Sequence, residues 1–205
     1  MVATGYPMGS AAWLPYPATV PPATETRVRA LPTAELSDAE TTAIQALLSA
    51  AFKRDEHGGF TWDDWLHALG GVHFILERDG GIVGHASVVQ RALEISGRPV
   101  RTGYVEAVAI LPSLQRTGLG SLLMRAVNEH VAAEYELGAL GTGTQPFYQQ
   151  LGWLIWQGPT SVRIDGRTEP TPDEDGYILV LPTPTSPPFE LSEPISCEWR
   201  PGDAW

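Results

Sequence analysis

Cysteine is nearly absent from this sequence of 205 residues, which contains a single one, Cys197. One cysteine excludes an internal disulfide and a zinc site built on several thiolates, and it fits a reducing compartment. We expect Cys197 to be a small buried hydrophobic side chain. Long apolar runs are also absent, and no uninterrupted stretch approaches the roughly 18 residues of a membrane span. The N-terminus lacks the basic start and apolar stretch of a secretory signal, so we expect a cytoplasmic protein.

Positive charge is scarce as well. The 13 lysines and arginines face 24 aspartates and glutamates, which gives a formal net charge of -11. Such a surface repels nucleic acid and anionic membranes and attracts cations, so the sequence favours a polycationic substrate and predicts neither nucleic acid nor membrane as a partner. The seven tryptophans are scattered rather than interleaved with basic residues, which favours core packing or a sugar-stacking wall.

Motifs for metal binding and for a serine nucleophile are missing too. The histidines show neither H-E-x-x-H nor comparable ligand spacing, so no metal site is predicted; they are His57, His67, His73, His85 and His130. Ser87 and Ser121 have no nucleophile elbow around them. The sequence therefore predicts chemistry that needs neither a resident metal nor a serine acyl-enzyme.

The length suits one ordinary domain that buries a core without disulfides or metal. Residues 1–32 carry many prolines and small residues without apolar periodicity, and we expect a poorly ordered or surface-draped extension there. Residues 33–205 then form a single domain. The tail beyond Pro182 contains a strand-like stretch and ends in an aromatic residue, which favours a tail folded back onto the body.

Three helices are predicted with their start signals. A capping box at 37–40 precedes apolar residues at helical spacing from Ile44 to Phe52. Thr61 and Asp64 begin a short helix, closed by the glycines at 70–71, that we expect to carry Trp62 and Trp65 inward. Apolar residues at three- and four-residue steps predict a longer helix over 118–135 with one buried face.

Strand patterns fill most of the remaining sequence. Glycine-containing turns at 79–81 and 96–99 join three antiparallel strands over 72–77, 82–95 and 100–110. Later strands are predicted over 139–142, 153–156, 160–164 and 177–181, and a brief helix over 146–151. Together these elements predict an α/β domain with a central mixed, mostly antiparallel sheet flanked by helices.

The segment from Tyr104 to Gly120 passes from a strand through a short loop into a helix. Free amides at a helix N-terminus, with the positive end of the helix dipole behind them, bind phosphate oxygens. Gly118 and Gly120 remove Cβ atoms that would block close approach, and Arg116 adds a cation. A bare G-x-G more often marks a glycine-softened helix start beside a solvated arginine, so the glycines alone leave both interpretations open.

The letters of this turn, Gln115-Arg-Thr-Gly-Leu-Gly120, resemble motif A of the GNAT acetyltransferase superfamily, whose pattern is Q/R-x-x-G-x-G/A. The resemblance implies the GNAT fold, with acetyl-CoA as co-substrate. The pyrophosphate would bind the turn, which consists of Gln115, Arg116, Thr117, Gly118, Leu119 and Gly120. In this superfamily the preceding strand pairs its backbone with the pantetheine arm, which would involve Val108, Ala109 and Ile110.

Further blocks lie outside the turn, among them Trp65-Leu-His-Ala-Leu-Gly-Gly-Val-His73, Gly103-Tyr-Val-Glu106, Pro172-Asp-Glu-Asp-Gly176 and Gly202-Asp-Ala-Trp205. Over about residues 35–205 the chain resembles the aminoglycoside 2'-N-acetyltransferases. The resemblance implies acetylation of the 2'-amino group of an aminoglycoside, which confers antibiotic resistance, and it implies a homodimer. It also implies an acidic pocket for the ammonium groups of the amino sugar; the substrate residues would be Asp64, Glu106, Ala107, Gly141, Glu174, Asp203 and the Trp205 carboxylate.

Glu106 is the candidate base, because the attacking amine must be neutral while the free substrate is largely protonated at pH 7. It shares a strand face with Val108 and Ile110, and a carboxylate in apolar company has a raised pKa that suits a base acting directly or through water. The alternative is a structural ion pair with an arginine. Tyr148 lies where the GNAT pattern has a tyrosine that protonates the departing CoA thiolate, whereas a lone tyrosine more often serves packing.

Departures from the family pattern leave the substrate open. Gly59 stands where relatives have an aspartate, Gly141 stands in place of a serine, and Glu174 replaces an aspartate. The loop 141–146 is also shorter than usual. A less cationic amino sugar such as kasugamycin is therefore an alternative substrate. A second hypothesis is a GNAT enzyme that acetylates a different small amine, such as a polyamine or a biosynthetic amino sugar. A third is a non-catalytic protein that binds acetyl-CoA or an aminoglycoside.

Overall fold

The structure is a computed structural model that describes residues 25–52 and 59–205. Its strands are β1 (Thr26–Pro32), β2 (Val72–Arg78), β3 (Gly81–Ile95), β4 (Arg98–Ile110), β5 (Leu137–Gly141), β6 (Leu154–Ile155), β7 (Thr160–Ile164), β8 (Arg167–Pro170), β9 (Ile178–Pro182) and β10 (Ile195–Glu198). The helices are α1 (Asp38–Ala51), α2 (Trp62–His67), α3 (Leu119–Glu134) and α4 (Gln145–Gln149), with short 3-10 turns η1 (Thr33–Glu35), η2 (Pro112–Leu114) and η3 (Pro172–Glu174).

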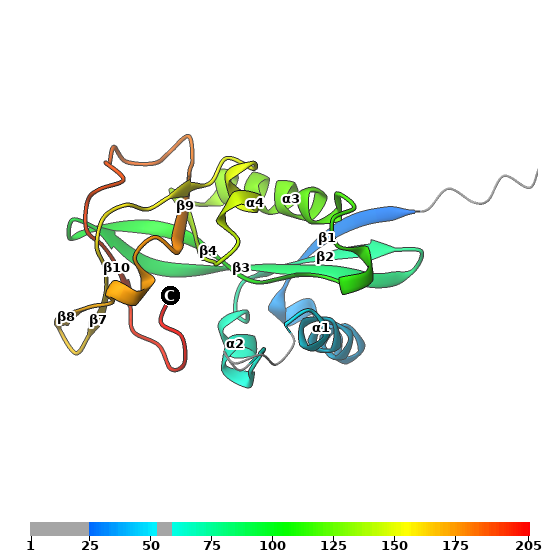
Figure 1. Cartoon of the computed structure of the whole chain (residues 1–205). Coiled ribbons are helices and arrows are strands. Elements are labelled where there is room, and N and C mark those ends of the chain that lie inside the picture. The colour runs from blue at the N-terminus through cyan, green and yellow to red at the C-terminus, as the bar shows by residue number, and fades with distance from the viewer. Residues whose placement is uncertain (1–24, 53–58) are drawn as a thin grey trace, which may run out of the picture.

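A long twisted sheet divides the molecule into layers (Figure 1): α3 and α4 lie over one face, and α1 and α2 lie over the other. The strands pair in the order β6-β9-β5-β4-β3-β10-β7-β8, with β2 also on β3 and β1 on β2. The β4–β5 and β10–β7 pairs are parallel, and the others are antiparallel. This confirms the predicted α/β fold with a mixed, mostly antiparallel sheet flanked by helices.

Strand β1 corrects the expected boundary of the extension. It lies within residues 1–32, yet all seven of its residues pair with β2, from Thr26 opposite Arg78 to Pro32 opposite Val72. The pairing depends on a partner about 50 residues away, since the Nε atoms of Arg27 and Arg29 donate to Glu77 at 2.6 and 2.8 Å. Local composition gave no sign of that contact. Residues 1–24 lie outside the described part of the chain.

The predicted capping box at 37–40 is present, and the start signal at Thr61 and Asp64 also forms one. The Ser37 hydroxyl accepts from the Glu40 amide while the Glu40 side chain accepts from the Ser37 amide, and Thr61 and Asp64 do the same at α2. The expectation that both tryptophans of α2 point inward is half wrong. Trp65 is buried against the rings of His73 and His85, but Trp62, at the first position of the helix, is 64% exposed. With six residues, α2 offers the sheet one short face.

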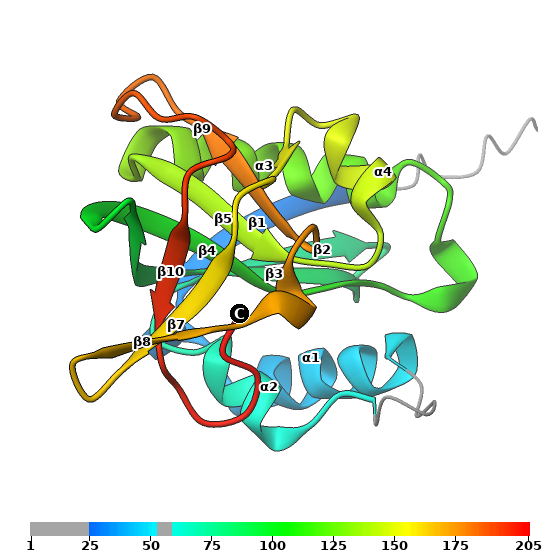
Figure 2. The ribbon, with the colours of Figure 1, turned by 60° about the vertical axis from the view of Figure 1, so that its left-hand side comes forward.

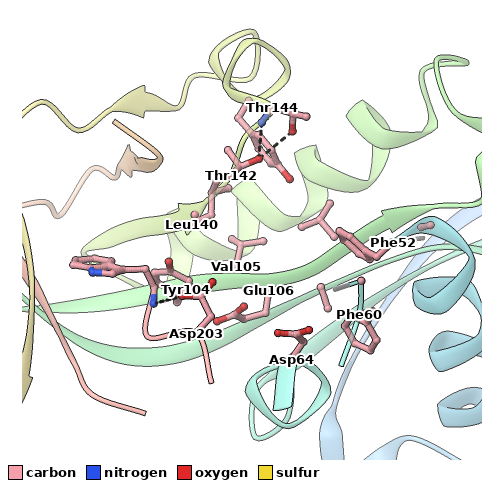
Figure 3. Close-up of a pocket in the computed structure, with 17 residues that line it drawn as sticks. Phe52, Phe60, Asp64, Tyr104, Val105, Glu106, Leu140, Thr142, Thr144 and Asp203 are labelled. Atoms are coloured by element: carbon pink, nitrogen blue, oxygen red, sulfur yellow. Dashed lines mark hydrogen bonds between the residues drawn. The ribbon is translucent and has the colours of Figure 1, made fainter. Parts of the chain in front are cut away.

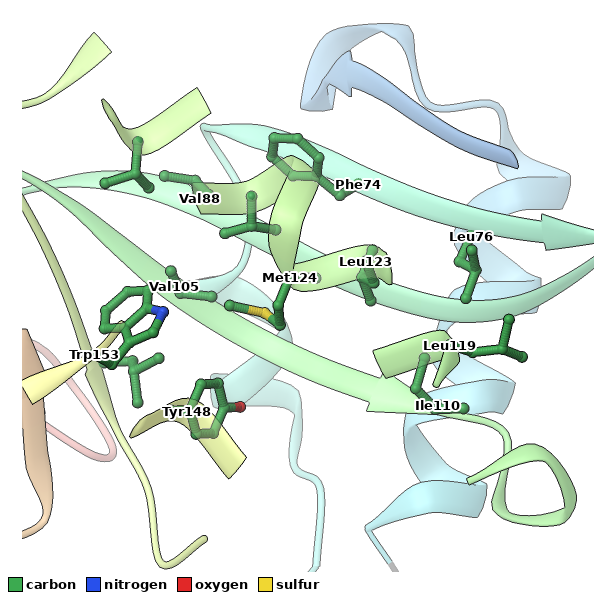
Figure 4. Close-up of a cluster of buried hydrophobic side chains, with 14 of the residues drawn as sticks. Phe74, Leu76, Val88, Val105, Ile110, Leu119, Leu123, Met124, Tyr148 and Trp153 are labelled. Carbon is green, nitrogen blue, oxygen red and sulfur yellow. The ribbon is translucent and has the colours of Figure 1, made fainter. Parts of the chain in front are cut away.

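Figure 4 shows the core between α3 and the sheet. Helix α3 has one buried face, as predicted, made by Leu119, Leu123, Met124, Val127 and Val131, against sheet residues that include Phe74, Leu76, Val88 and Val105. Leu122, expected on this face, is 38% exposed. Each buried side chain contributes about 1.5 to 3 kcal/mol of burial free energy, so this packing fixes α3 on the sheet. Within residues 25–52 and 59–205, no helix has the length and apolarity needed to cross a membrane.

The C-terminal segment is folded onto the body, as predicted. In Figure 2 the chain runs through β10, loops past α2 and ends at the centre of this face. Strand β10 lies between β3 and β7, and Trp205 is 4% exposed, with its indole N–H donating to Thr171 Oγ1 at 3.0 Å. The buried Arg91 guanidinium donates to the carbonyls of Ala204 and Glu198, both at 2.8 Å. These contacts hold the tail in one position.

Candidate active site

A cavity of about 680 Å³ opens between the end of α1, the start of α2, the middle of β4, the end of β5 and the C-terminal segment. Figure 3 shows that Glu106, Asp64 and Asp203 point toward one another from three different elements, and that Leu140, Thr142 and Thr144 lie across the cavity from them. Val105, Ala107, Val108, Gly141, Tyr148 and Trp205 are also in the wall. The cavity is thus acidic on one side.

The cavity exists because β4 and β5 diverge. They pair only over Thr102–Tyr104 and Leu137–Ala139 within the described part of the chain. Farther along, β4 is held by β3 alone, and its register shifts between Glu106 and Ala109. Ala107 has a φ of 51° at this bulge, a conformation that costs a non-glycine residue free energy. The shift places Glu106, Ala107 and Val108 side by side in the cavity wall.

Glu106 forms the arginine ion pair that the sequence left open, and its carboxyl is also buried. Burial raises the pKa of its carboxyl above the usual 4.5, and Arg200 opposes that rise. The Arg200 Nη1 atom donates to Glu106 Oε1 at 2.6 Å. Among the described residues, no hydrogen-bond donor besides Arg200 reaches this carboxylate, so its second oxygen remains for a ligand in the cavity.

Arg200 was not singled out by the sequence. Besides Glu106 it contacts Trp205 O through Nη2 at 3.2 Å and the Asp203 carbonyl through Nε at 2.8 Å. It thereby ties the last residues of the chain to β4. The sequence did contain a signal for Arg200. The tail was predicted to bring its carboxylates close to a buried Glu106, and such a group of negative charges needs a cation nearby. Arg200 and Arg91 also flank the Tyr104 ring, at 5.6 and 4.8 Å from its centroid.

The acidic residues are not all in the wall. Asp64 lines the cavity while its Oδ2 accepts the capping bonds of α2, so the helix start fixes its position. Asp203 lines the cavity and accepts from the Trp205 amide at 3.1 Å. Glu174 is absent from the wall; burial, together with Asp203 and Asp173, raises the pKa of its carboxyl. Glu174 therefore lies near enough to Asp203 for the two carboxylates to repel each other, but it does not line the cavity.

Tyr148 and Gly141 also line the cavity. Tyr148, at the end of α4, is 7% exposed, and burial raises the pKa of its hydroxyl to about 12. The hydroxyl therefore stays protonated and can donate a hydrogen bond at neutral pH. A Cβ on Gly141 would lie 3.5 Å from the Tyr104 hydroxyl and 3.8 Å from the Trp205 carboxyl carbon. The glycine leaves room at that point of the wall.

The turn from Gln115 to Gly120 lies outside the cavity, beyond the far end of β4. Arg116 and Gly118 both have positive φ angles, of 60° and 89°, and α3 begins without a side-chain cap. Its first amides therefore face outward without a partner in the helix. The side-chain amide of Gln115 donates to the Ile110 carbonyl at 3.2 Å, and Thr117 Oγ1 donates to Leu114 O at 2.6 Å. These bonds shape an exposed loop of amides.

Gly120 has a second reason to be a glycine. A Cβ there would approach the ring of Phe147 to 3.3 Å, so the residue permits α4 to pack on α3. At Gly118 nothing lies within 4 Å of such a Cβ, and the left-handed backbone alone favours glycine.

Comparison with known proteins identifies the family to which this fold and cavity belong. The profile of the acetyltransferase (GNAT) family matches residues 37–153. The chain belongs to this family. It is similar to the aminoglycoside 2'-N-acetyltransferase of Mycolicibacterium fortuitum, with 40% identity over 152 residues that cover 72% of this chain and 78% of that protein. The chain is an acyltransferase of the GNAT fold.

Two solved GNAT structures match most of the chain. The N-acetyltransferase YhbS of Escherichia coli, solved with CoA, has a TM-score of 0.58 at 14% identity and covers 86% of this chain and 91% of its own. A Brucella melitensis acetyltransferase, solved with acetyl-CoA, has a TM-score of 0.56 at 17% identity. The match covers 83% of this chain and 94% of that protein. Two further proteins of similar fold are longer, and this chain spans 34% and 33% of their lengths.

The GNAT fold brings many of the expected site residues together and separates others. The wall of the cavity contains Asp64, Glu106, Ala107, Gly141, Tyr148, Asp203, Trp205 and Val108. The side chains of Ala109 and Ile110 are buried in the cores on opposite faces of the sheet, so these residues offer a cofactor only their backbone. Glu174 and the turn lie outside the wall. His57 lies outside the described residues.

Proposed function

We propose that this GNAT enzyme transfers acetyl from acetyl-CoA to the 2'-amino group of an aminoglycoside antibiotic. The observation that carries the proposal is the convergence of Asp64, Glu106 and Asp203 on one cavity beside the bulge of β4. An aminoglycoside carries several ammonium groups, and each one needs an acceptor when it leaves water. The similarity to the 2'-N-acetyltransferase of M. fortuitum supports this substrate class.

Acetyl-CoA would lie along the unpaired edge of β4. Its pyrophosphate would bind the amides of residues 115–120 at the positive end of the α3 dipole. The backbone of Val108, Ala109 and Ile110 would pair with the pantetheine arm and bring the thioester to the bulge. CoA and acetyl-CoA in the solved relatives support this cofactor.

Transfer would be direct. Glu106 accepts a proton from the substrate ammonium, itself or through a water, and the neutral amine attacks the thioester carbon to form a C–N bond. The tetrahedral intermediate then breaks its C–S bond. The Tyr148 hydroxyl donates its proton to the departing sulfur. The acylated nitrogen loses its extra proton, which returns to the Tyr148 oxygen through a water, and Glu106 releases its proton to solvent. The products are the acetamide and CoA. No covalent enzyme intermediate is required.

The test is a panel of amines scored by thiol release and by mass for the position of the new acetyl group. We expect 2'-amino aminoglycosides to be acetylated. Replacing either reacting side chain, with Glu106→Gln or Tyr148→Phe, should lower kcat about 100-fold or more and leave the Kd of acetyl-CoA within about threefold. Unchanged rates in both variants would refute the assigned roles, and a panel without turnover would refute the proposed function.

A less cationic amino sugar such as kasugamycin is the second candidate. It is favoured because Gly59 and Gly141 line the cavity and Glu174 does not, so the wall has fewer acidic and polar groups than the resemblance implies. The same panel separates the two candidates by their kcat/KM values.

A homodimer and a role in antibiotic resistance belong to this proposal as well, on the basis of the family resemblance. So does a cytoplasmic location, on the basis of the N-terminal sequence. Light scattering of the purified protein tests the dimer. Susceptibility of cells with and without the gene tests resistance.

A further inference from the structure

The bulge in β4 leaves a backbone carbonyl without its usual partner. His85 pairs with Ala109 and Ser87 pairs with Glu106, so that one residue of β3 faces two residues of β4, Ala107 and Val108. Such an interruption removes a ladder hydrogen bond, and a buried carbonyl needs a replacement. The side chain of His85 supplies it, since its Nδ1 atom lies 2.9 Å from the Ala107 oxygen.

Behind His85 the hydrogen bonds continue to the start of the domain. His85 Nε2 lies 2.9 Å from His73 Nδ1, and His73 Nε2 lies 2.8 Å from Thr33 Oγ1. The Gly70 amide, just after α2, donates to that same Thr33 oxygen at 2.9 Å. Both histidines are 0% exposed. A single chain of contacts therefore leads from the end of α2 through the sheet to the bulge.

The donor and acceptor of each hydrogen bond between Thr33 and Ala107 follow from the last acceptor, the Ala107 carbonyl. A carbonyl oxygen can only accept, so His85 must carry its proton on Nδ1. Burial lowers the pKa of His73 to about 4 and that of His85 to about 3, so both rings are neutral at pH 7. A neutral His85 then accepts at Nε2 from His73 Nδ1–H. In turn, His73 accepts at Nε2 from the Thr33 hydroxyl at 2.8 Å, a shorter contact than the 3.3 Å from that hydroxyl to the Gly71 carbonyl.

The orientation of one peptide group links the chain of bonds to the cavity. The Ala107–Val108 peptide is trans, and in a trans peptide the C=O and N–H bonds point in opposite directions. The Ala107 carbonyl faces His85, so the Val108 N–H points away from that side. Beyond Tyr104, β5 no longer pairs with β4, and Val108 lines the cavity. The amide is thus available to an acyl oxygen there.

We propose that His85, held by His73 and Thr33, is a positioning residue for acyl transfer: it fixes the Ala107–Val108 peptide so that the Val108 amide faces the thioester. This inference rests on the proposed function. Two buried histidines that merely satisfy one another in the core would give the same contacts. The two interpretations differ in their effect on the reaction: only a positioning role predicts slower acyl transfer when the donor to the Ala107 carbonyl is removed.

The decisive comparison is His85→Asn against His85→Leu. The asparagine side-chain amide nitrogen is bonded to Cγ, as Nδ1 is in histidine, so it keeps the donor near Ala107 O, whereas leucine removes it at similar bulk. A misplacement of about 1 Å costs roughly 100-fold in rate. We expect His85→Leu to lower kcat by about that factor with an unchanged Kd for acetyl-CoA, and His85→Asn to stay within about tenfold of the wild type.

Two NMR measurements need no amine acceptor. In the wild type at pH 7, the imidazole nitrogen shifts should show the proton on Nδ1 of both His73 and His85. The Val108 amide shift should differ between the CoA and acetyl-CoA complexes, and this difference should persist in His85→Asn and vanish in His85→Leu. If His85→Leu does not fold, Thr33→Val, which removes the first donor at a half-buried site, should reduce both kcat and the shift difference.

The outcomes separate the inference from the function on which it rests. A wild type that does not bind acetyl-CoA refutes the proposed function, and the inference with it. A wild type that binds acetyl-CoA while the asparagine and leucine variants lose equal activity refutes the inference alone. Protons on Nε2 of the two histidines would also refute it.

Discussion

At the scale of single residues, the proposed base Glu106 is also one partner of an ion pair with Arg200. Its carboxylate is buried, which raises its pKa, and Arg200 at 2.6 Å keeps the rise within bounds. A carboxylate that ionises far above neutrality would be protonated when the amine arrives. One that ionises far below would be too weak a base. Arg200 therefore limits the rise in the pKa of Glu106 that burial causes, besides holding the tail.

This role predicts a change in the pH profile of Arg200→Gln. Removing the cation removes the influence that lowers the pKa of Glu106, so that pKa rises further and the carboxylate stays protonated to a higher pH. The kcat/KM of the variant relative to the wild type should fall as the pH is lowered from about 9 to about 5. Titration of the substrate cancels in this ratio.

The control for that experiment is Arg167→Gln, an exposed arginine on β8. Its ratio should not vary with pH. A flat ratio for Arg200→Gln as well would mean that Arg200 holds the tail without influencing the base.

At the scale of elements, the turn before α3 depends on a backbone that only glycine adopts easily at 118. Gly118→Ala would meet no atom within 4 Å, yet an L side chain in the left-handed conformation costs about 1 to 2 kcal/mol. We expect the turn to relax and move its amides, and the Kd of acetyl-CoA, measured by calorimetry, to rise roughly tenfold.

Gly166→Ala is the matched control for this prediction. Gly166 has a φ of 75° in the β7–β8 turn and also has open space at its Cβ position. Gly166→Ala should lower the melting temperature by about as much as Gly118→Ala does, and it should leave the Kd of acetyl-CoA unchanged. Equal Kd values for both variants would remove the turn from the cofactor site.

Elements defined by local signals were predictable from the sequence, and elements defined by distant partners were not. Ser37 and Glu40 form a capping box within one turn, and the apolar face of α3 repeats within the helix itself. Strand β1 depends on Glu77 and the rest of β2, and β8 is a four-residue strand whose residues are all exposed. Local composition and periodicity do not predict such pairings.

The same division holds within the candidate site. Glu106, Tyr148 and the turn at 115–120 followed from motifs contiguous in the sequence. Arg200 and the bonds from Thr33 to Ala107 bring together groups 12 to 94 residues apart. Whether Glu174 lines the cavity or lies behind it depends on how η3 packs against the tail. Sequence spacing does not determine such packing.

At the scale of the whole molecule, a net charge of -11 attracts any cationic substrate, so the local contribution of the cavity must be measured separately. Deleting residues 203–205 would not isolate it. Trp205 is part of a hydrophobic cluster with Tyr104, Trp156 and Ile195, and losing a buried tryptophan costs about 3 to 5 kcal/mol. A smaller change is needed that removes charge and keeps the tail folded.

Asp203→Asn is that change. An asparagine oxygen can still accept from the Trp205 amide, as Asp203 Oδ1 does at 3.1 Å, so the tail should keep its place while the cavity loses one negative charge. We expect the KM of a tri- or tetra-cationic aminoglycoside to rise roughly tenfold, the value of one charge-assisted hydrogen bond, with the Kd of acetyl-CoA unchanged. The control is Asp79→Asn, at an exposed turn between β2 and β3. It changes the net charge by the same amount, but at a position far from the cavity. If both variants raise the KM equally, the substrate responds to the field of the whole surface, and the cavity carboxylates lose their assigned role.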